Sequence, residues 1–82
     1  MARIRKSGMS GPEIEAAFNE SRLGDYPKDT LQAMGKDLYA DYRCLMTWKA
    51  NGSLRKPMTE GEIEAIGDIA RAILAEADSR NS

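Results

Sequence analysis

The side chains that most often carry out chemistry in proteins are scarce in this sequence. Its 82 residues include no histidine and a single cysteine, Cys44. Without histidine the chain lacks the usual general base near neutral pH and the commonest metal ligand. Cys44 has no histidine to activate it and no second cysteine to share a disulfide or a metal ion. The sequence therefore predicts an unreactive, partly exposed thiol.

Carboxylates are plentiful, because 13 Asp and Glu residues accompany 12 Lys and Arg residues. Glu13 and Glu15 are two residues apart, as are Glu62 and Glu64. On a helix such neighbours point about 160° away from each other. They are therefore poorly placed to work as an acid–base pair, and we interpret them as solvated side chains.

Two further segments have only part of a binding motif. Asp37 and Asp41 are spaced to share a helical face, but no calcium-binding loop accompanies them. The Gly35-Lys36 pair lacks the upstream glycine of a phosphate-binding loop. Gly35 is better explained as a position where two helices cross closely. We therefore expect no enzymatic activity, no metal site and no cofactor.

Whatever surface the protein uses must be positioned by helices. Apolar residues recur every three or four positions over residues 60–80 and again over 27–50, which is typical of amphipathic helices. A shorter helix is expected over residues 11–23, with Gly24 as its stop, and Asn51-Gly52 should end the second helix. The predicted fold is all-α, with the short N-terminal helix docked on an antiparallel two-helix hairpin. Residues 1–9 are expected to form a flexible basic tail to this single domain.

A short pattern recurs at two of the helix starts. Residues 9–16 read MSGPEIEA and residues 58–65 read MTEGEIEA. In each, a Ser or Thr is followed three residues later by Glu, which predicts a capping box. A basic pair precedes each copy, so two equivalent anion-binding sites are an alternative. Acidic side chains in both first turns already occupy the positive helix ends, which favours twin caps over anion sites.

The helix over residues 27–50 has an apolar arc that covers about half of its circumference at 100° per residue. A helix with a single neighbour needs a narrower stripe. We therefore expect a second contact, which the sequence leaves open between the first helix, a second copy of the chain and a foreign protein.

Three functions are compatible with these features, and a protein-binding regulator or inhibitor is favoured. Tyr39, Arg43, Met46 and Trp48 are residue types that contribute strongly to interfaces. An exposed Tyr39–Arg43 pair is also compatible with a local cation–π contact alone. Brevity and the lack of catalytic motifs are typical of the small accessory proteins that phages and other mobile elements make to block a host machine.

The second hypothesis is a nucleic-acid-binding transcriptional regulator with a helix-turn-helix-like arrangement. Its candidate anion or phosphate contacts are Arg3, Arg5, Lys6, Arg55 and Lys56. The acidic helix over residues 60–80 and the formal net charge of −1 argue against it.

The third hypothesis is a structural oligomerisation module. Leu31, Leu38 and Leu45 form a seven-residue repeat that could pair with a second copy, which predicts a homodimer. The chain contains neither the apolar run of a membrane span nor that of a secretion signal. A cytoplasmic location is the expectation.

Overall fold

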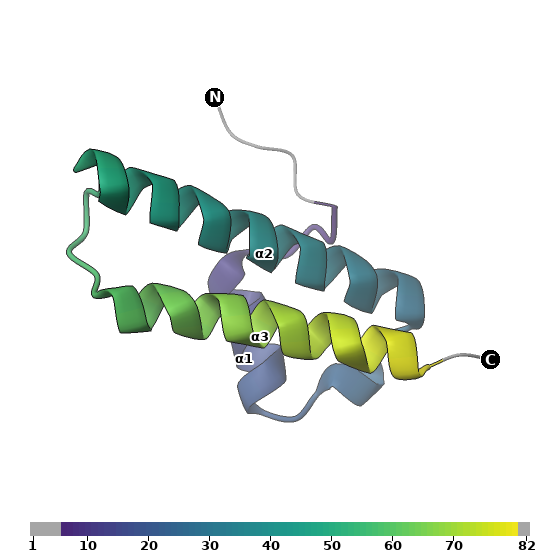
Figure 1. Cartoon of the computed structure of the whole chain (residues 1–82). Coiled ribbons are helices and arrows are strands. Elements are labelled where there is room, and N and C mark those ends of the chain that lie inside the picture. The colour runs from purple at the N-terminus through teal and green to yellow at the C-terminus, as the bar shows by residue number, and fades with distance from the viewer. Residues whose placement is uncertain (1–5, 81–82) are drawn as a thin grey trace.

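The computed structural model describes residues 6–80 and has the predicted all-α arrangement (Figure 1). Its helices are α1 (Gly11–Asn19), α2 (Lys28–Asn51) and α3 (Glu60–Ser79), with a short 3₁₀ turn at Leu23–Asp25. α2 and α3 lie side by side as an antiparallel hairpin, and α1 lies behind them in the view of Figure 1. None of these helices is both long and apolar enough to cross a membrane.

Both predicted capping boxes are present. The hydroxyl of Ser10 accepts from the Glu13 backbone N–H at 3.3 Å, and the Glu13 carboxylate accepts from the Ser10 N–H at 3.0 Å. Thr59 and Glu62 repeat the arrangement at 3.1 and 2.9 Å. The hydrogen bond from the Thr59 backbone N–H lowers the pKa of Glu62 below its ordinary value. These carboxylates lie at the positive helix ends, which favours caps over anion sites.

The end of α1 differs from the prediction. The helix ends at Asn19, not at residue 23, so Gly24 is not its stop. Ser21 has a φ of 56°, in the left-handed region. The backbone N–H groups of Ser21 and Arg22 donate to carbonyls of the last helical turn at 3.1 and 2.8 Å. This is the Schellman arrangement, and it closes the helix with serine where glycine is usual.

Replacement of Ser21 with glycine should stabilise the fold by about 0.5–1 kcal/mol. The left-handed conformation costs a serine roughly 1–2 kcal/mol. Glycine avoids this cost, but it loses more chain entropy on folding, which offsets part of the gain. Urea denaturation followed by circular dichroism would measure the change. Asn19→Gly, inside the helix, should have the opposite sign. Equal destabilisation by both variants would contradict this description of the turn.

The α2–α3 hairpin is packed closely through two glycines. A Cβ atom on Gly35 would lie 2.6 Å from Cγ of Leu74, and one on Gly67 would lie 2.9 Å from the ring of Tyr42. Neither position has room for a side chain without movement of its neighbour. The prediction that Gly35 permits a close helix crossing is therefore confirmed.

The core lies toward one end of this hairpin. α1 contributes Ile14 and Ala17, which pack with buried residues from the first half of α2 and the second half of α3. The buried apolar side chains of the described part are Ile14, Ala17, Leu31, Met34, Leu38, Ile63, Ala70, Ile73 and Ala77. Beyond Leu38, no residue of α2 is buried. The short α1 thus covers one end of the hairpin and leaves the other end as two helices only.

The chain before α1 is attached to the hairpin through a buried carboxylate. Asp37 is 2% exposed. It accepts from the backbone N–H groups of Lys6 at 3.0 Å and Ser7 at 2.8 Å, and from the Ser7 hydroxyl at 2.6 Å. Residues 6 and 7 of the segment expected to be a flexible tail are thus bonded to α2, while residues 1–5 lie outside the described residues. These hydrogen bonds account for the buried Asp37 carboxylate, so no cation shared with Asp41 is needed to explain it.

The end of α3 is tied to the connection that precedes α2. Arg80 forms the predicted ion pair with Glu76 at 3.2 Å. Its guanidinium also donates to the backbone carbonyls of Tyr26 at 3.1 Å and Leu23 at 3.2 Å. One arginine thus fastens the 3₁₀ turn to the last turn of α3.

Candidate protein-binding surfaces

The four residues predicted to bind a partner do not form one surface. Tyr39 stacks on Tyr42 beneath Arg71 of α3, whereas Trp48 lines a hollow with residues of α1. On a helix, Arg43 and Trp48 point about 140° apart. Arg43 and Met46 lie within about 40° of Tyr39 around the helix. These three residues therefore share a face, and Trp48 lies on a separate one.

The first surface, which we call the seam face, follows the junction of α2 and α3. It consists of Tyr39, Tyr42, Arg43 and Met46 from α2 and Glu64, Asp68 and Arg71 from α3. The rings of Tyr39 and Tyr42 are stacked, with centroids 5.6 Å apart and planes 12° apart. The guanidinium carbon of Arg71 lies 5.9 and 5.7 Å from the two centroids. This is within cation–π range of both rings.

Hydrogen bonds fix the seam face from the α3 side. The hydroxyl of Tyr42 donates to the carboxylate of Glu64 at 3.2 Å, and Arg71 donates to Asp68 at 3.1 Å. The side chain of Arg71 nevertheless stays 54% exposed. The rings are thus held in place while the cation above them remains accessible to solvent.

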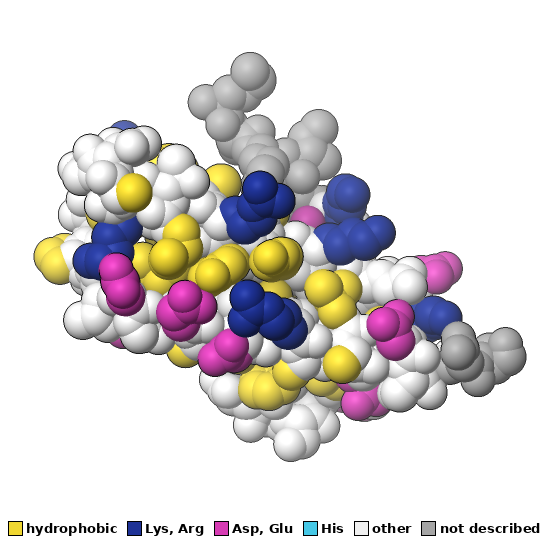
Figure 2. Space-filling view, in the orientation of Figure 1, with side chains coloured by type: hydrophobic (Ala, Val, Ile, Leu, Met, Phe, Trp, Pro, Cys, Tyr) yellow, Lys and Arg dark blue, Asp and Glu magenta, His cyan; other side chains and the backbone are white. Residues whose placement is uncertain are grey.

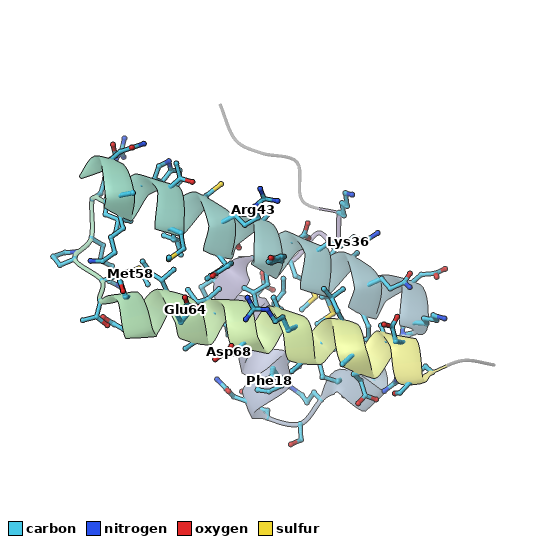
Figure 3. All side chains as sticks on the ribbon, in the orientation of Figure 1. Phe18, Lys36, Arg43, Met58, Glu64 and Asp68 are labelled. Atoms are coloured by element: carbon cyan, nitrogen blue, oxygen red, sulfur yellow. The ribbon has the colours of Figure 1, made fainter. Side chains whose placement is uncertain are left out.

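The seam face has an ordered distribution of charge (Figure 2). Hydrophobic side chains form a line between α2 and α3, with basic side chains along the α2 border and mainly acidic ones along the α3 border. Figure 3 shows Lys36 and Arg43 on α2, and Glu64 and Asp68 on α3. Arg43 is exposed, and Lys36 is exposed one helical turn from Tyr39.

The arginine over Tyr39 was not the expected one. The alternative read from the sequence was a local contact between Tyr39 and Arg43, four residues later on the same helix, whereas the structure stacks Tyr39 beneath Arg71 of α3. Tyr39 and Arg71 are 32 residues apart in the chain. No local pattern signals such a pair, because it arises only when the hairpin closes.

The second surface, which we call the Trp48 groove, runs from the N-terminal end of α1 to the connection between α2 and α3. It comprises two adjoining hollows of about 470 and 560 Å³ that share Leu45 and Trp48. The first is lined by Gly11, Pro12, Glu15, Leu38, Asp41, Cys44, Leu45, Trp48 and Ile66, and the second by Leu45, Trp48, Ser53, Leu54, Arg55, Lys56 and Met58. Trp48 is 48% exposed in this mainly apolar groove.

Charged residues lie at opposite ends of the Trp48 groove. Glu15 and Asp41 line only the first hollow, and Arg55 and Lys56 line only the second. The connection that bears the basic pair is held by Lys49, whose ammonium donates to the carbonyl of Met58 at 2.9 Å. The groove therefore has one acidic end and one basic end, with Trp48 between them.

The other predicted anion contacts are not gathered with this basic pair. Arg3 and Arg5 lie outside the described residues. Lys6 is exposed, and its backbone is bonded to Asp37 of α2. Of the three candidates that the structure describes, it brings together Arg55 and Lys56, and it places them beside apolar side chains.

Carboxylates and the Cys44 thiol are the side chains of this chain that bear on metal binding and catalysis. Within residues 6–80, no group of three Cys, Asp or Glu side chains is arranged to hold a metal ion. Cys44 is exposed and lines the first hollow of the Trp48 groove.

No family model matches this chain, and no curated protein or solved structure is significantly similar to it.

Proposed function

We propose that this protein is a non-catalytic, protein-binding regulator that binds its target through the seam face. The observation that supports this is the Tyr39–Tyr42 stack beneath the half-exposed Arg71. Tyrosine and arginine are among the residues on which binding energy concentrates. Rings that are already ordered in the free protein lose little conformational entropy when a partner covers them.

The charge pattern of the seam face indicates what kind of partner fits it. The α2 border carries Lys36 and Arg43, and the α3 border carries Glu64 and Asp68. A complementary partner is an amphipathic helix whose apolar stripe lies on the two tyrosines. Its acidic side would face α2 and its basic side would face α3. Like charges placed opposite each other would reject the reverse orientation.

The nucleic-acid hypothesis has less support. A helix-turn-helix joins two steeply crossed helices by a short turn, whereas α2 and α3 are packed side by side (Figure 1). α3 begins with Glu60 and Glu62 and has no basic residue in its last turn. Phosphate contacts from such a helix would be unfavourable. We therefore retain protein binding as the proposal.

Affinity capture from cells of the source organism tests the proposal. Wild-type protein is compared with a Tyr39→Ala, Arg43→Ala double variant by quantitative mass spectrometry. Loss of two contacts worth about 1 kcal/mol or more each should weaken capture of the target at least tenfold. Circular dichroism verifies that the double variant folds, because Arg43 is exposed but Tyr39 packs against the core.

Trp48→Ala is the matched control, because it removes a large side chain from the same helix on the other face. It should leave the affinity of a single chain for the target unchanged, because Trp48 lies outside the seam face. Equal capture by wild-type protein and a folded double variant would overturn the assignment of the seam face. Absence of any specifically captured protein would overturn the proposed function.

A further inference from the structure

The Trp48 groove is a mainly apolar surface that the N-terminal end of α1 borders but does not cover. No residue of α2 beyond Leu38 is buried, and Trp48 is 48% exposed between two hollows. A small domain has little core, and a shared core between two copies is one way to compensate. We propose that the groove is closed by a second copy of this chain, in an antiparallel arrangement about a twofold axis near Leu45 and Trp48.

The distribution of charge along the groove supports a second copy as the occupant. Glu15 and Asp41 lie at one end, and Arg55 and Lys56 lie at the other. In a twofold interface, each patch meets the patch related to it by the axis. An axis perpendicular to the groove at its centre brings the acidic end of each copy against the basic end of the other. Two sets of opposite charges then flank the apolar centre.

The same charges exclude a parallel pair. If the two grooves ran in the same direction, acidic ends would meet acidic ends and basic ends would meet basic ends. Like charges across an interface oppose association. The groove thus specifies both its partner and the direction in which that partner lies.

The two tryptophans would meet close to the axis. Trp48 and Leu45 are common to both hollows, so they lie where the halves of the groove join. Tryptophan at the centre of a desolvated interface commonly contributes a large share of the binding energy. The seam face lies on another side of α2, so a closed groove would leave it free in each copy.

Sedimentation equilibrium and fluorescence test self-association directly. Trp48 is the single tryptophan of the chain, so its emission reports on the groove alone. We expect a dimer mass at tens of micromolar and a shift of the emission to longer wavelength when the dimer is diluted. Trp48→Ala should weaken dimerisation roughly 30-fold or more. Trp48→Ala retains every buried apolar side chain of the described residues, and circular dichroism verifies that it folds.

Charge exchange tests the antiparallel arrangement. An acidic-end variant carries Glu15→Lys and Asp41→Asn, and a basic-end variant carries Arg55→Glu and Lys56→Glu. Each alone should weaken its homodimer about tenfold or more, because like or unmatched charges then meet at both ends. An equimolar mixture should form a heterodimer, because all basic charges are then on one chain and all acidic charges on the other. This recovery also shows that neither variant is misfolded.

Three results would overturn the inference. The first is a wild-type mass of one chain at 100 μM. The second is a dimer that neither charge variant weakens. The third is an equimolar mixture of the two charge variants that does not associate. The proposed function is tested separately, because it depends on Tyr39 and Arg43 and not on the groove. Capture of a foreign protein by a monomeric chain, lost with Trp48→Ala, would assign the groove to that protein instead.

Discussion

Replacement of Asp37 with alanine should lower the free energy of unfolding by about 2–4 kcal/mol, because hydrogen bonds to a charged acceptor are worth roughly 1.5–3 kcal/mol. Asp37 is 2% exposed and accepts from Lys6 and Ser7. Alanine would leave their donors without this acceptor and would open a small void beside α2. A domain of this size has a total stability of about 4–12 kcal/mol, so the loss would be large.

Thermal and urea denaturation would measure this loss. Asp68→Ala is the matched control, since that carboxylate is 75% exposed and bridges to Arg71 at 3.1 Å; its removal should cost less than about 1 kcal/mol. The loss of stability in Asp37→Asn should fall between those of Asp37→Ala and Asp68→Ala, because asparagine keeps one carbonyl oxygen as an acceptor. Hydrogen exchange adds a local measurement, in which the Ser7 amide should lose protection in Asp37→Ala. A variant with wild-type stability would contradict the role of Asp37 in holding the N-terminal segment.

Replacement of Gly35 with alanine should destabilise the protein by about 1–2 kcal/mol net, although alanine is the better helix former. The new Cβ would lie 2.6 Å from Cγ and 2.7 Å from Cδ2 of Leu74, and 3.4 Å from the carbonyl of Ala70. Relief of the overlap requires α2 and α3 to separate or Leu74 to leave its rotamer. Overpacking costs about 1–3 kcal/mol, and an approach as close as 2.6 Å belongs to the upper part of that range. The gain of about 1 kcal/mol in helix propensity therefore offsets only part of the cost.

A double-mutant cycle identifies the cause. In a Leu74→Ala background, Gly35→Ala should become neutral or stabilising, because only helix propensity remains. Gly61→Ala serves as the control glycine, since its Cβ would come no closer than 3.8 Å to the Thr59 hydroxyl. That variant should be neutral or slightly stabilising. Equal effects of Gly35→Ala with and without Leu74 would show that the helix crossing is not the cause.

Most of the helical framework could be predicted because its signals are local. The capping boxes join Ser10 to Glu13 and Thr59 to Glu62. Residues three apart interact as soon as a turn forms, so the pattern of types is sufficient. The end of α1 was mispredicted for the same reason. Gly24 matched the local preference, but the Schellman turn closed three residues earlier with Ser21 in the left-handed region.

The candidate surfaces were predicted as a set of residue types and not as an arrangement. Tyr39, Arg43 and Met46 lie on the seam face, but Trp48 lies in the groove. The wide apolar arc of α2 correctly indicated a second neighbour. Its position could not be read from the arc, because the length of α1 determines which part of α2 is covered.

The sequence by itself determined three amphipathic helices, two N-terminal caps and the glycine stop at Gly52, whose φ is 71°. These depend on interactions within about four residues, so they require no knowledge of the fold. Only the tertiary structure decided that Asp37 would hold Lys6 and Ser7, and that Arg71 would cover Tyr39. Those contacts join residues 30 or more positions apart. They form when the packing of α2 against α3 and α1 brings the side chains together, and no pattern along the chain encodes that geometry.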